Sequence, residues 1–348
     1  MRQSFLDLVI RVSWFVFREK STNHESRTTK RILFLFLISA FILHPSSFIL
    51  AQHTRLYACA LGSDDPTAFM GGSSMGGGLW QSDDTGKTWK QLGWKHVKCY
   101  SVDVVEKSNG RVIYEACGNG VLRSIDSGAN WRMVTDWRIT EVMDIAVDQE
   151  EPNNIYIATP GAIWKSDDGG DNWYEADSDI PYPIFVSRIK IDPRNHLNVY
   201  AATESGLYQS GNAGLSWNRW SDSNRSVKDF LITSGRISAW IEERGIMHFL
   251  DSTTWKEWNF DTVLWSIYGY DNALVLGSPP RVFFGHPNVT AHRSPQNVHS
   301  ALKLDNEMFF GSLSSGMWLY PLDGHRPACG QTGLNSLQIW RIKAVEIK

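Results

Sequence analysis

Short apolar runs of four or five residues, each bounded by polar turn residues, recur along the chain after residue 52. Runs of this length, rich in Val, Ile, Leu, Tyr and Trp, are typical of buried β-strands. Many come in pairs separated by a Gly-containing turn, which predicts antiparallel hairpins. The first members of four pairs are residues 56–59, 113–116, 155–158 and 199–202, and the second members begin at Gly78, Gly120, Ala162 and Gly206.

A polar phrase follows the second run of each of these pairs, and its four copies start about 42 residues apart. The phrase reads Ser-x-Asp-x-Gly-x-x-Trp, with Asn in place of Asp in the fourth copy. A fixed period of this size predicts a repeat architecture with one supersecondary unit per period. The residues predicted to build the repeated turn are Ser82, Asp84, Gly86, Trp89, Ser124, Asp126, Gly128, Trp131, Ser166, Asp168, Gly170, Trp173, Ser210, Asn212, Gly214 and Trp217.

The chemistry of the phrase is that of a turn between two strands. A short hydroxyl or carboxylate side chain accepts backbone N–H bonds that the strand ladder cannot reach. The glycine tolerates a positive φ, and the indole covers the turn. A calcium loop of the EF-hand type needs further oxygen ligands and a Glu six residues beyond its glycine, and no copy supplies that set. We therefore predict a structural role for the phrase, with no metal and no other cofactor.

This spacing resembles the Asp-box, or bacterial neuraminidase repeat, and the resemblance implies an all-β propeller of four-stranded blades. Weaker hairpins at 238–241, 274–277 and 309–312 bring the count to seven blades, with six or eight as alternatives. An inner strand precedes each unit except the first. Residues 339–347 match that strand at the C-terminus, where they would complete blade one and close the ring. Closure protects sheet edges that would otherwise pair with other chains.

Several families share this repeat, so the resemblance implies a fold rather than an activity. Sialidases carry the box, but their Arg-Ile-Pro phrase is missing here, and residues 187–190 come nearest without the proline. Xyloglucanase-type glycosidases typically pair two propellers, whereas this chain has room for one. The photosystem II assembly factor family and the sortilin-type receptor domain have strand and turn sequences similar to residues 199–210. A sortilin ring would need more blades than this chain has.

The N-terminal region has the pattern of an export signal. Lys30 and Arg31 precede an apolar stretch at 32–43, which is too short for a comfortable membrane span and typical of a secretory signal. We predict a signal segment over residues 1–51, cleaved before Gln52 or retained as a membrane anchor, and a propeller over 52–348. The predicted location is secreted or periplasmic, with membrane contact only if the segment is uncleaved.

Charge adds one exclusion. Residues 1–51 carry seven Lys or Arg and three Asp or Glu, so the rest of the chain has a formal charge of −7 against −3 for the whole. An acidic domain without a basic run is a poor match for nucleic acid, whose binding rests on neutralising phosphates. We predict a monomer that binds a protein or a carbohydrate and no nucleic acid.

Four cysteines, an even number, permit two disulfides in an exported chain. Cys99 and Cys117 fall nearly opposite one another on adjacent predicted strands, which leaves Cys59 and Cys329 to tether the ring closure. Buried free thiols are the alternative.

In a propeller, the loops between the second and third strands share a face with the blade-to-blade connections, and ligands are expected there. Blade one has a Gly-rich insertion on this face, at residues 61–77, which either closes over a ligand or is a surface insertion. Aromatic rings beside carboxylates suit carbohydrate binding and acid–base work. The candidates near this face or the channel are Glu141, Glu204, Glu243, Trp265, His299 and Trp340. The alternative is structural, with the tryptophans in the core and the glutamates solvated. His299 lacks partners at metal-ligand spacing.

Three functions remain open from the sequence. The first is an exported, non-catalytic propeller that binds a protein or glycan, since no catalytic set can be placed. The second is a glycoside hydrolase of sialidase or endoglucanase type. The third is an assembly factor for a membrane complex, held by an uncleaved anchor.

Overall fold

The computed structural model describes residues 54–63, 76–182, 184–220, 224–233, 236–241, 245–249, 255–258, 266–270, 273–278, 281–285, 290–293, 298–304, 307–321, 328–329, 334 and 337–346. The strands between 245 and 293, and the one at 328–329, are described by their backbone. The chain divides into two units, Met1–Gln52 and His53–Lys348. The predicted signal segment and most of the Gly-rich insertion lie outside the described residues. Among those described, no helix is long and apolar enough to cross a membrane.

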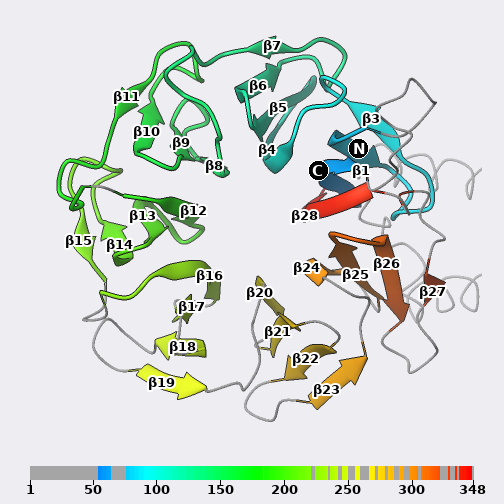
Figure 1. Cartoon of the computed structure of the whole chain (residues 1–348). Helices are drawn as coiled ribbons and strands as arrows, with labels where there is room; N and C mark the ends of the chain where they lie inside the picture. Colours follow the sequence, from blue (N-terminus) through cyan, green and yellow to red (C-terminus); the bar gives the residue numbers. More distant parts are fainter. Residues whose placement is uncertain are drawn as a thin grey trace, which may run out of the picture. The chain divides into compact units, whose positions relative to one another are not determined.

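Within His53–Lys348, the described strands form seven four-stranded antiparallel sheets (Figure 1). The first sheet is β28 (Leu337–Glu346), β1 (Thr54–Ser63), β2 (Gly78–Ser82) and β3 (Lys90–Leu92). The second is β4 (Cys99–Lys107), β5 (Gly110–Cys117), β6 (Gly120–Ser124) and β7 (Arg132–Met133). The third is β8 (Asp144–Val147), β9 (Ile155–Ala158), β10 (Ile163–Ser166) and β11 (Tyr174–Glu175). The fourth is β12 (Val186–Asp192), β13 (Asn195–Thr203), β14 (Gly206–Ser210) and β15 (Asn218–Arg219).

The remaining three sheets repeat the arrangement. The fifth is β16 (Val227–Thr233), β17 (Arg236–Ile241), β18 (Gly245–Phe249) and β19 (Trp255–Trp258). The sixth is β20 (Ser266–Tyr270), β21 (Ala273–Ser278), β22 (Arg281–Gly285) and β23 (Thr290–Arg293). The seventh is β24 (Val298–Leu304), β25 (Glu307–Ser312), β26 (Gly316–Pro321) and β27 (Ala328–Cys329).

The two ends of the described unit meet in one sheet. The C-terminal strand β28 pairs antiparallel with β1, from Thr54 opposite Glu346 to Ser63 opposite Leu337. The strand β28 therefore occupies in the first sheet the inner position that β4 occupies in the second (Figure 1). Each inner strand contacts the inner strand of the following sheet, and β24 of the seventh sheet contacts β28.

The core lies between the sheets, and β9 shows how the sequence produces this packing. Ile155 and Ile157 belong to the hydrophobic cluster between the second and third sheets, whereas Tyr156 and Ala158 belong to the cluster between the third and fourth. Successive side chains of a strand point to opposite faces, so a strand that is buried on both faces reads as a continuous apolar run. The runs at 56–59 and 199–202 are apolar for the same reason, whereas the run at 113–116 is interrupted by Glu115.

The four repeated turns (82–89, 124–131, 166–173 and 210–217) join the third and fourth strands of the first four sheets. In the third sheet, the Ser166 hydroxyl donates to Asp168 Oδ1 at 2.8 Å and accepts from Gly170 N at 2.8 Å. Asp168 in turn accepts from Asn172 N at 2.9 Å and Asn172 Nδ2 at 2.7 Å. The Trp173 indole closes the turn by donating to the Gly170 carbonyl at 3.1 Å.

The other copies repeat this pattern with small variations. The serine-to-glycine N–H bond is 2.8 Å in every copy. The glycines have φ between 83° and 95°, which explains why this position is glycine. In the fourth copy the indole of Trp217 donates to Ala176 O of the preceding connection, at 2.6 Å, rather than to its own turn.

Each of the last two turns is also attached to the sheet before it. The Tyr114 hydroxyl of the second sheet donates to Gly169 O at 3.0 Å, and the Tyr156 hydroxyl of the third sheet donates to Ala213 O at 3.0 Å. The repeated phrase therefore fixes both the hairpin and the packing of neighbouring sheets.

Candidate functional site

The segments between sheets and the turns between second and third strands lie on one face of the described unit, as the antiparallel order requires. Hydrogen bonds connect the two sets. Glu141 N donates to Gly118 O at 2.9 Å, Val186 N to Thr159 O at 3.3 Å, and Glu204 N to Phe185 O at 3.1 Å. We call this surface the connection face; its described segments are 93–98, 118–119, 134–143, 159–162, 176–182, 184–185 and 204–205.

Three of the predicted candidates come together where the inner strands begin. His299 of β24 stacks on Trp340 of β28, with ring centroids 3.8 Å apart and planes 22° apart. Tyr100 of β4 meets Trp340 edge-on at 6.0 Å. The Tyr100 hydroxyl donates to Glu141 Oε2 at 2.7 Å. We call Tyr100, Glu141, His299 and Trp340 the rim cluster.

The rim cluster is partly buried: Tyr100 and His299 are buried, Trp340 is half-buried and Glu141 is exposed. Burial lowers the pKa of His299 to about 4, and the Arg188 guanidinium nearby acts in the same direction, so the imidazole is neutral at pH 7. Burial, followed by the hydrogen bond to Glu141, raises the pKa of Tyr100. Glu141 has a φ of 51°, in the left-handed region that non-glycine residues rarely adopt. One face of the Trp340 ring is already covered by His299, which leaves less of it for a ligand.

The other three candidates do not join this cluster. Glu204 is exposed on the turn between β13 and β14, and its side chain contacts no member of the rim cluster among the described residues. Glu243 and Trp265 lie outside the described residues.

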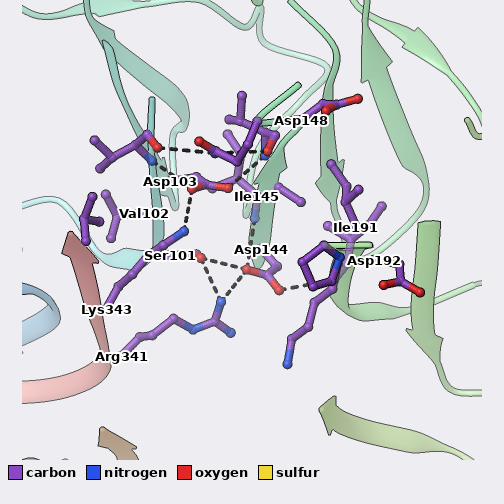
Figure 2. A pocket seen from close by; sticks show the side chains of 18 of the residues that line it. Ser101, Val102, Asp103, Asp144, Ile145, Asp148, Ile191, Asp192, Arg341 and Lys343 are labelled. Atoms are coloured by element: carbon purple, nitrogen blue, oxygen red, sulfur yellow. Dashed lines mark hydrogen bonds and ion pairs between the residues drawn. The ribbon is translucent and has the colours of Figure 1, made fainter. Parts of the chain in front are cut away.

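A cavity of about 580 Å³ lies along the inner strands, and sequence analysis did not predict its residues (Figure 2). It is lined by β4, β8, β12, β16 and β28, including Asp103, Asp144, Asp229, Lys190, Arg341 and Lys343. Lys343 reaches toward Asp103, and Arg341 toward Ser101 and Asp144 (Figure 2). The cavity therefore contains charges of both signs in close contact.

Each of the three central carboxylates has a cationic partner and a backbone donor. Asp103 accepts from Val104 N and Val147 N, both at 2.8 Å, besides Lys343. Asp144 pairs with Arg341 and accepts from Ser101 Oγ at 2.7 Å, Ile145 N at 3.0 Å and Ile189 N at 3.2 Å. These bonds hold neighbouring inner strands together.

Asp229 of β16 is paired in the same way. Its carboxylate lies 3.3 Å from Arg188 Nε and 3.5 Å from Lys190 Nζ, and it accepts from Phe230 N at 2.7 Å. Burial would raise the pKa of Asp229, but the Lys190 ammonium and the Arg188 guanidinium outweigh it and lower the pKa. Its lowered pKa keeps Asp229 ionised, and an ionised carboxylate is a poor general acid.

Cys59, Cys99 and Cys117 are free thiols, as in the alternative to the two possible disulfides. Cys99 and Cys117 do lie directly opposite one another on β4 and β5, yet they are not bonded. The Cys99 thiol instead contacts the main-chain oxygen of Ser101 at 3.8 Å and shares a buried cluster with Cys59. Cys59 is also free, so the pair with Cys329 is not formed either: Cys329 is on the outermost strand of the seventh sheet.

Glu115 is an interior carboxyl group that the sequence did not single out. It lies on β5, fully buried, and neither carboxyl oxygen has a hydrogen-bond partner. Burial raises the pKa of Glu115 to about 8, although the nearby Cys99 thiol acts in the opposite direction.

No three His, Cys, Asp or Glu side chains among the described residues are placed to hold a metal ion.

Exposed aromatic side chains stand on three successive segments of the connection face. Trp94 follows β3, Trp137 follows β7 and Tyr182 follows β11, with 44%, 85% and 86% of their surface exposed. Sequence reasoning missed them, although each is an aromatic residue inside a polar segment between two predicted strands. Such a position is a weak signal because exposure cannot be read from composition.

No family model matches the chain, and no curated protein matches it in sequence. Solved structures do match. The structure described as YCF48 bound to D1 peptide superposes with a TM-score of 0.56 at 14% identity, over 72% of this chain and 93% of that one. YCF48 from Cyanidioschyzon merolae superposes with a TM-score of 0.55 at 13% identity, over 70% of this chain and 88% of that one. The GH74 xyloglucanase from Xanthomonas campestris superposes with a TM-score of 0.61 at 14% identity, over 84% of this chain and 52% of that one.

The chain is a β-propeller. Its likeness to these structures, together with the seven four-stranded sheets, supports this fold. The matched structures include both a peptide complex and a xyloglucanase, and at 14% identity the likeness does not reach function. The propeller spans most of the length of YCF48 and about half of the xyloglucanase.

Proposed function

We propose that this chain is an exported, non-catalytic β-propeller that binds a protein partner on its connection face. The observation that carries the proposal is a contrast within the described residues. The cavity carboxylates Asp103, Asp144 and Asp229 are fully engaged, whereas aromatic side chains on the connection face are open to solvent. Aromatic residues are enriched at protein interfaces, where they contribute much of the affinity.

The proposal includes the architecture. The seven sheets are the blades of one propeller, β28 completes the first blade and closes the ring, and the repeated turns are Asp-boxes. The support is the pairing of β28 with β1, the contact of β24 with β28, and the shared hydrogen-bond pattern of the turns.

One matched structure supports the binding of a protein segment. YCF48 has been solved with a peptide, and this chain covers 93% of it. The chain spans about half the length of the xyloglucanase. For glycans, the described aromatic candidate Trp340 is already stacked on His299.

The test is sugar release by the full chain from a panel of sialosides and β-glucans. We expect no release above the buffer blank. Turnover that disappears in Glu204→Gln or Glu243→Gln would overturn the proposal and identify an acid or base. A matched control is Glu175→Gln, which removes an exposed carboxylate on the outermost strand β11, away from the cavity.

A further inference from the structure

Trp94, Trp137 and Tyr182 stand on three successive connection segments, and we call them the aromatic ridge. Each lies between the outermost strand of one sheet and the inner strand of the next. The inner strands β4, β8 and β12 contact one another in that order, so the three residues follow one another around the connection face. Single exposed apolar side chains are ordinary, whereas exposed aromatic rings on three successive segments offer several contacts to one extended partner.

The ridge stands on an ordered base. The segments that carry it also bury an aliphatic side chain each, namely Val97, Ile139 and Ile180. Ile139 N donates to Asp136 O at 3.1 Å and Ile180 N to Asp177 O at 2.9 Å, so two of the segments share the same turn. A preformed surface of aromatic side chains loses little conformational entropy on binding.

The carboxylates beside Trp137 and Tyr182 are already engaged. Asp136 binds the guanidinium of Arg138, with Nη2 at 2.7 Å. Asp177 accepts from Ile163 N at 3.0 Å, and Asp179 accepts from Trp217 N at 3.0 Å. A sugar needs free hydrogen-bonding groups beside the aromatic platform to orient its hydroxyls. Around Trp137 and Tyr182 the ridge therefore suits apolar side chains of a protein better than a glycan.

The two ends of the ridge have neighbours of opposite charge. Lys95 and Lys98 are exposed beside Trp94, and neither ammonium has a hydrogen-bond or ion-pair partner among the described residues. At the other end, Glu204 is exposed and hydrogen-bonded through its backbone to Phe185, close in sequence to Tyr182. A bound segment whose acidic residues face Lys95 and Lys98 is electrostatically complementary to this end.

We infer that the aromatic ridge is the docking site for an extended segment of a protein partner, apolar in its middle and acidic at the end that lies beside Trp94. The inference rests on the proposed binding function and names the surface and the chemistry of the partner. Its apolar side chains seat on Trp94, Trp137 and Tyr182. Its acidic residues pair with Lys95 and Lys98.

The probe is a display library of random twelve-residue peptides, selected on the immobilised full chain. The enriched peptides are synthesised and their affinities measured by calorimetry. We expect enrichment of peptides with aliphatic residues followed or preceded by Asp or Glu. The triple variant Trp94→Ala, Trp137→Ala, Tyr182→Ala should weaken binding at least tenfold without changing the unfolding midpoint.

The chain offers a closely matched control. Leu197, Ile125 and Leu215 are 44%, 72% and 73% exposed and lie at the opposite ends of the sheets, on the β13 hairpin and two repeated turns. The triple variant Ile125→Ala, Leu197→Ala, Leu215→Ala should leave affinity within twofold. The double variant Lys95→Glu, Lys98→Glu should weaken acidic peptides and remove most of the salt dependence of binding.

The outcomes separate this inference from the proposed function. Peptides that bind equally well to the ridge variant would overturn the ridge as the docking site while leaving a protein-binding propeller. Failure to enrich any ridge-dependent peptide would also overturn it. Binding of a xyloglucan or sialyl oligosaccharide that the ridge variant loses would assign the ridge to glycans. Sugar release would overturn the non-catalytic function independently of any peptide result.

Discussion

The two ends of the sheets satisfy their polar groups in different ways. At one end, each repeated turn pairs its serine, its Asp or Asn side chain and its glycine N–H within eight residues. At the other end, the connection segments bury aliphatic side chains and leave aromatic and charged side chains exposed. At the first end, the polar groups of each turn are satisfied within the turn or by the segment next to it. The second leaves surface that the fold does not use, which is where a partner can bind.

The carboxyl groups of the molecule make this comparison clearer. One buried carboxyl group is neither hydrogen-bonded within a turn nor exposed to solvent. Hydrogen bonds from the Asn172 side chain and backbone lower the pKa of Asp168 in its turn to about 2. Burial without a partner raises the pKa of Glu115 to about 8. The turn carboxylate is stabilised in its charged form, and the interior carboxyl group in its neutral form.

The largest effect is therefore expected at Glu115. Because its folded pKa lies above the unfolded value, the native state retains a proton that the unfolded state releases, and stability falls as pH rises from about 4.5 to about 8. The fall should be on the order of several kcal/mol. Glu115→Gln cannot ionise, so the variant should be more stable than the wild type at pH 8.5 and not at pH 5.

Urea denaturation at pH 5, 7 and 8.5 checks this, with Glu204→Gln as the control because that side chain is exposed. Parallel pH dependences for the wild type and Glu115→Gln would show that Glu115 titrates normally, and would remove the contrast with Asp168.

A second prediction tests whether the repeated turns depend on their serine. Ser166 is fully buried and provides the acceptor for Gly170 N and Asp168 N. In Ser166→Ala both donors lose this acceptor, which should lower the free energy of unfolding by about 2 kcal/mol. Ser178→Ala, on the connection face, should change it by less than about 0.5 kcal/mol. Equal losses in the two variants, measured by urea denaturation, would contradict the difference between the two ends.

The same difference explains how much the sequence could predict. The repeated turn is determined by residues within one short phrase, so the period and spacing of the phrase identify it. The pairing of β28 with β1 could be predicted because the first sheet lacked an inner strand and the C-terminal residues matched one. The rim cluster combines three residues that the sequence had named separately as near one face or the channel, Glu141 at a loop end and His299 and Trp340 on predicted inner strands.

The cavity and the ridge could not be predicted in this way. Asp103 and Lys343 are 240 residues apart in sequence and meet only because the last strand joins the first sheet. Nothing in the local sequence distinguishes Lys343 from a solvated lysine. Exposure of Trp137 likewise depends on what the neighbouring sheets leave uncovered. The sequence left free thiols and disulfides open for a related reason, because opposition on paired strands does not by itself produce a disulfide.

The smallest of these effects is expected at the turn glycine. Gly214 has a φ of +83°, and a Cβ added there would lie 3.0 Å from Cε1 of Tyr156, the ring that attaches this turn to the third sheet. Gly214→Ala should therefore cost about 1–2 kcal/mol through backbone strain and displacement of that ring. Gly161, on the connection face, has open space around its Cβ position, and Gly161→Ala should be neutral or slightly stabilising.

Urea denaturation of the two glycine variants measures this difference with the same chemical change at each end of the sheets. A loss in Gly214→Ala with none in Gly161→Ala would show that conformational constraint is concentrated in the repeated turns. Equal behaviour would mean that the turn relaxes around the new methyl group. In that case the glycine of the phrase would be explained by something other than the left-handed backbone and the contact with Tyr156.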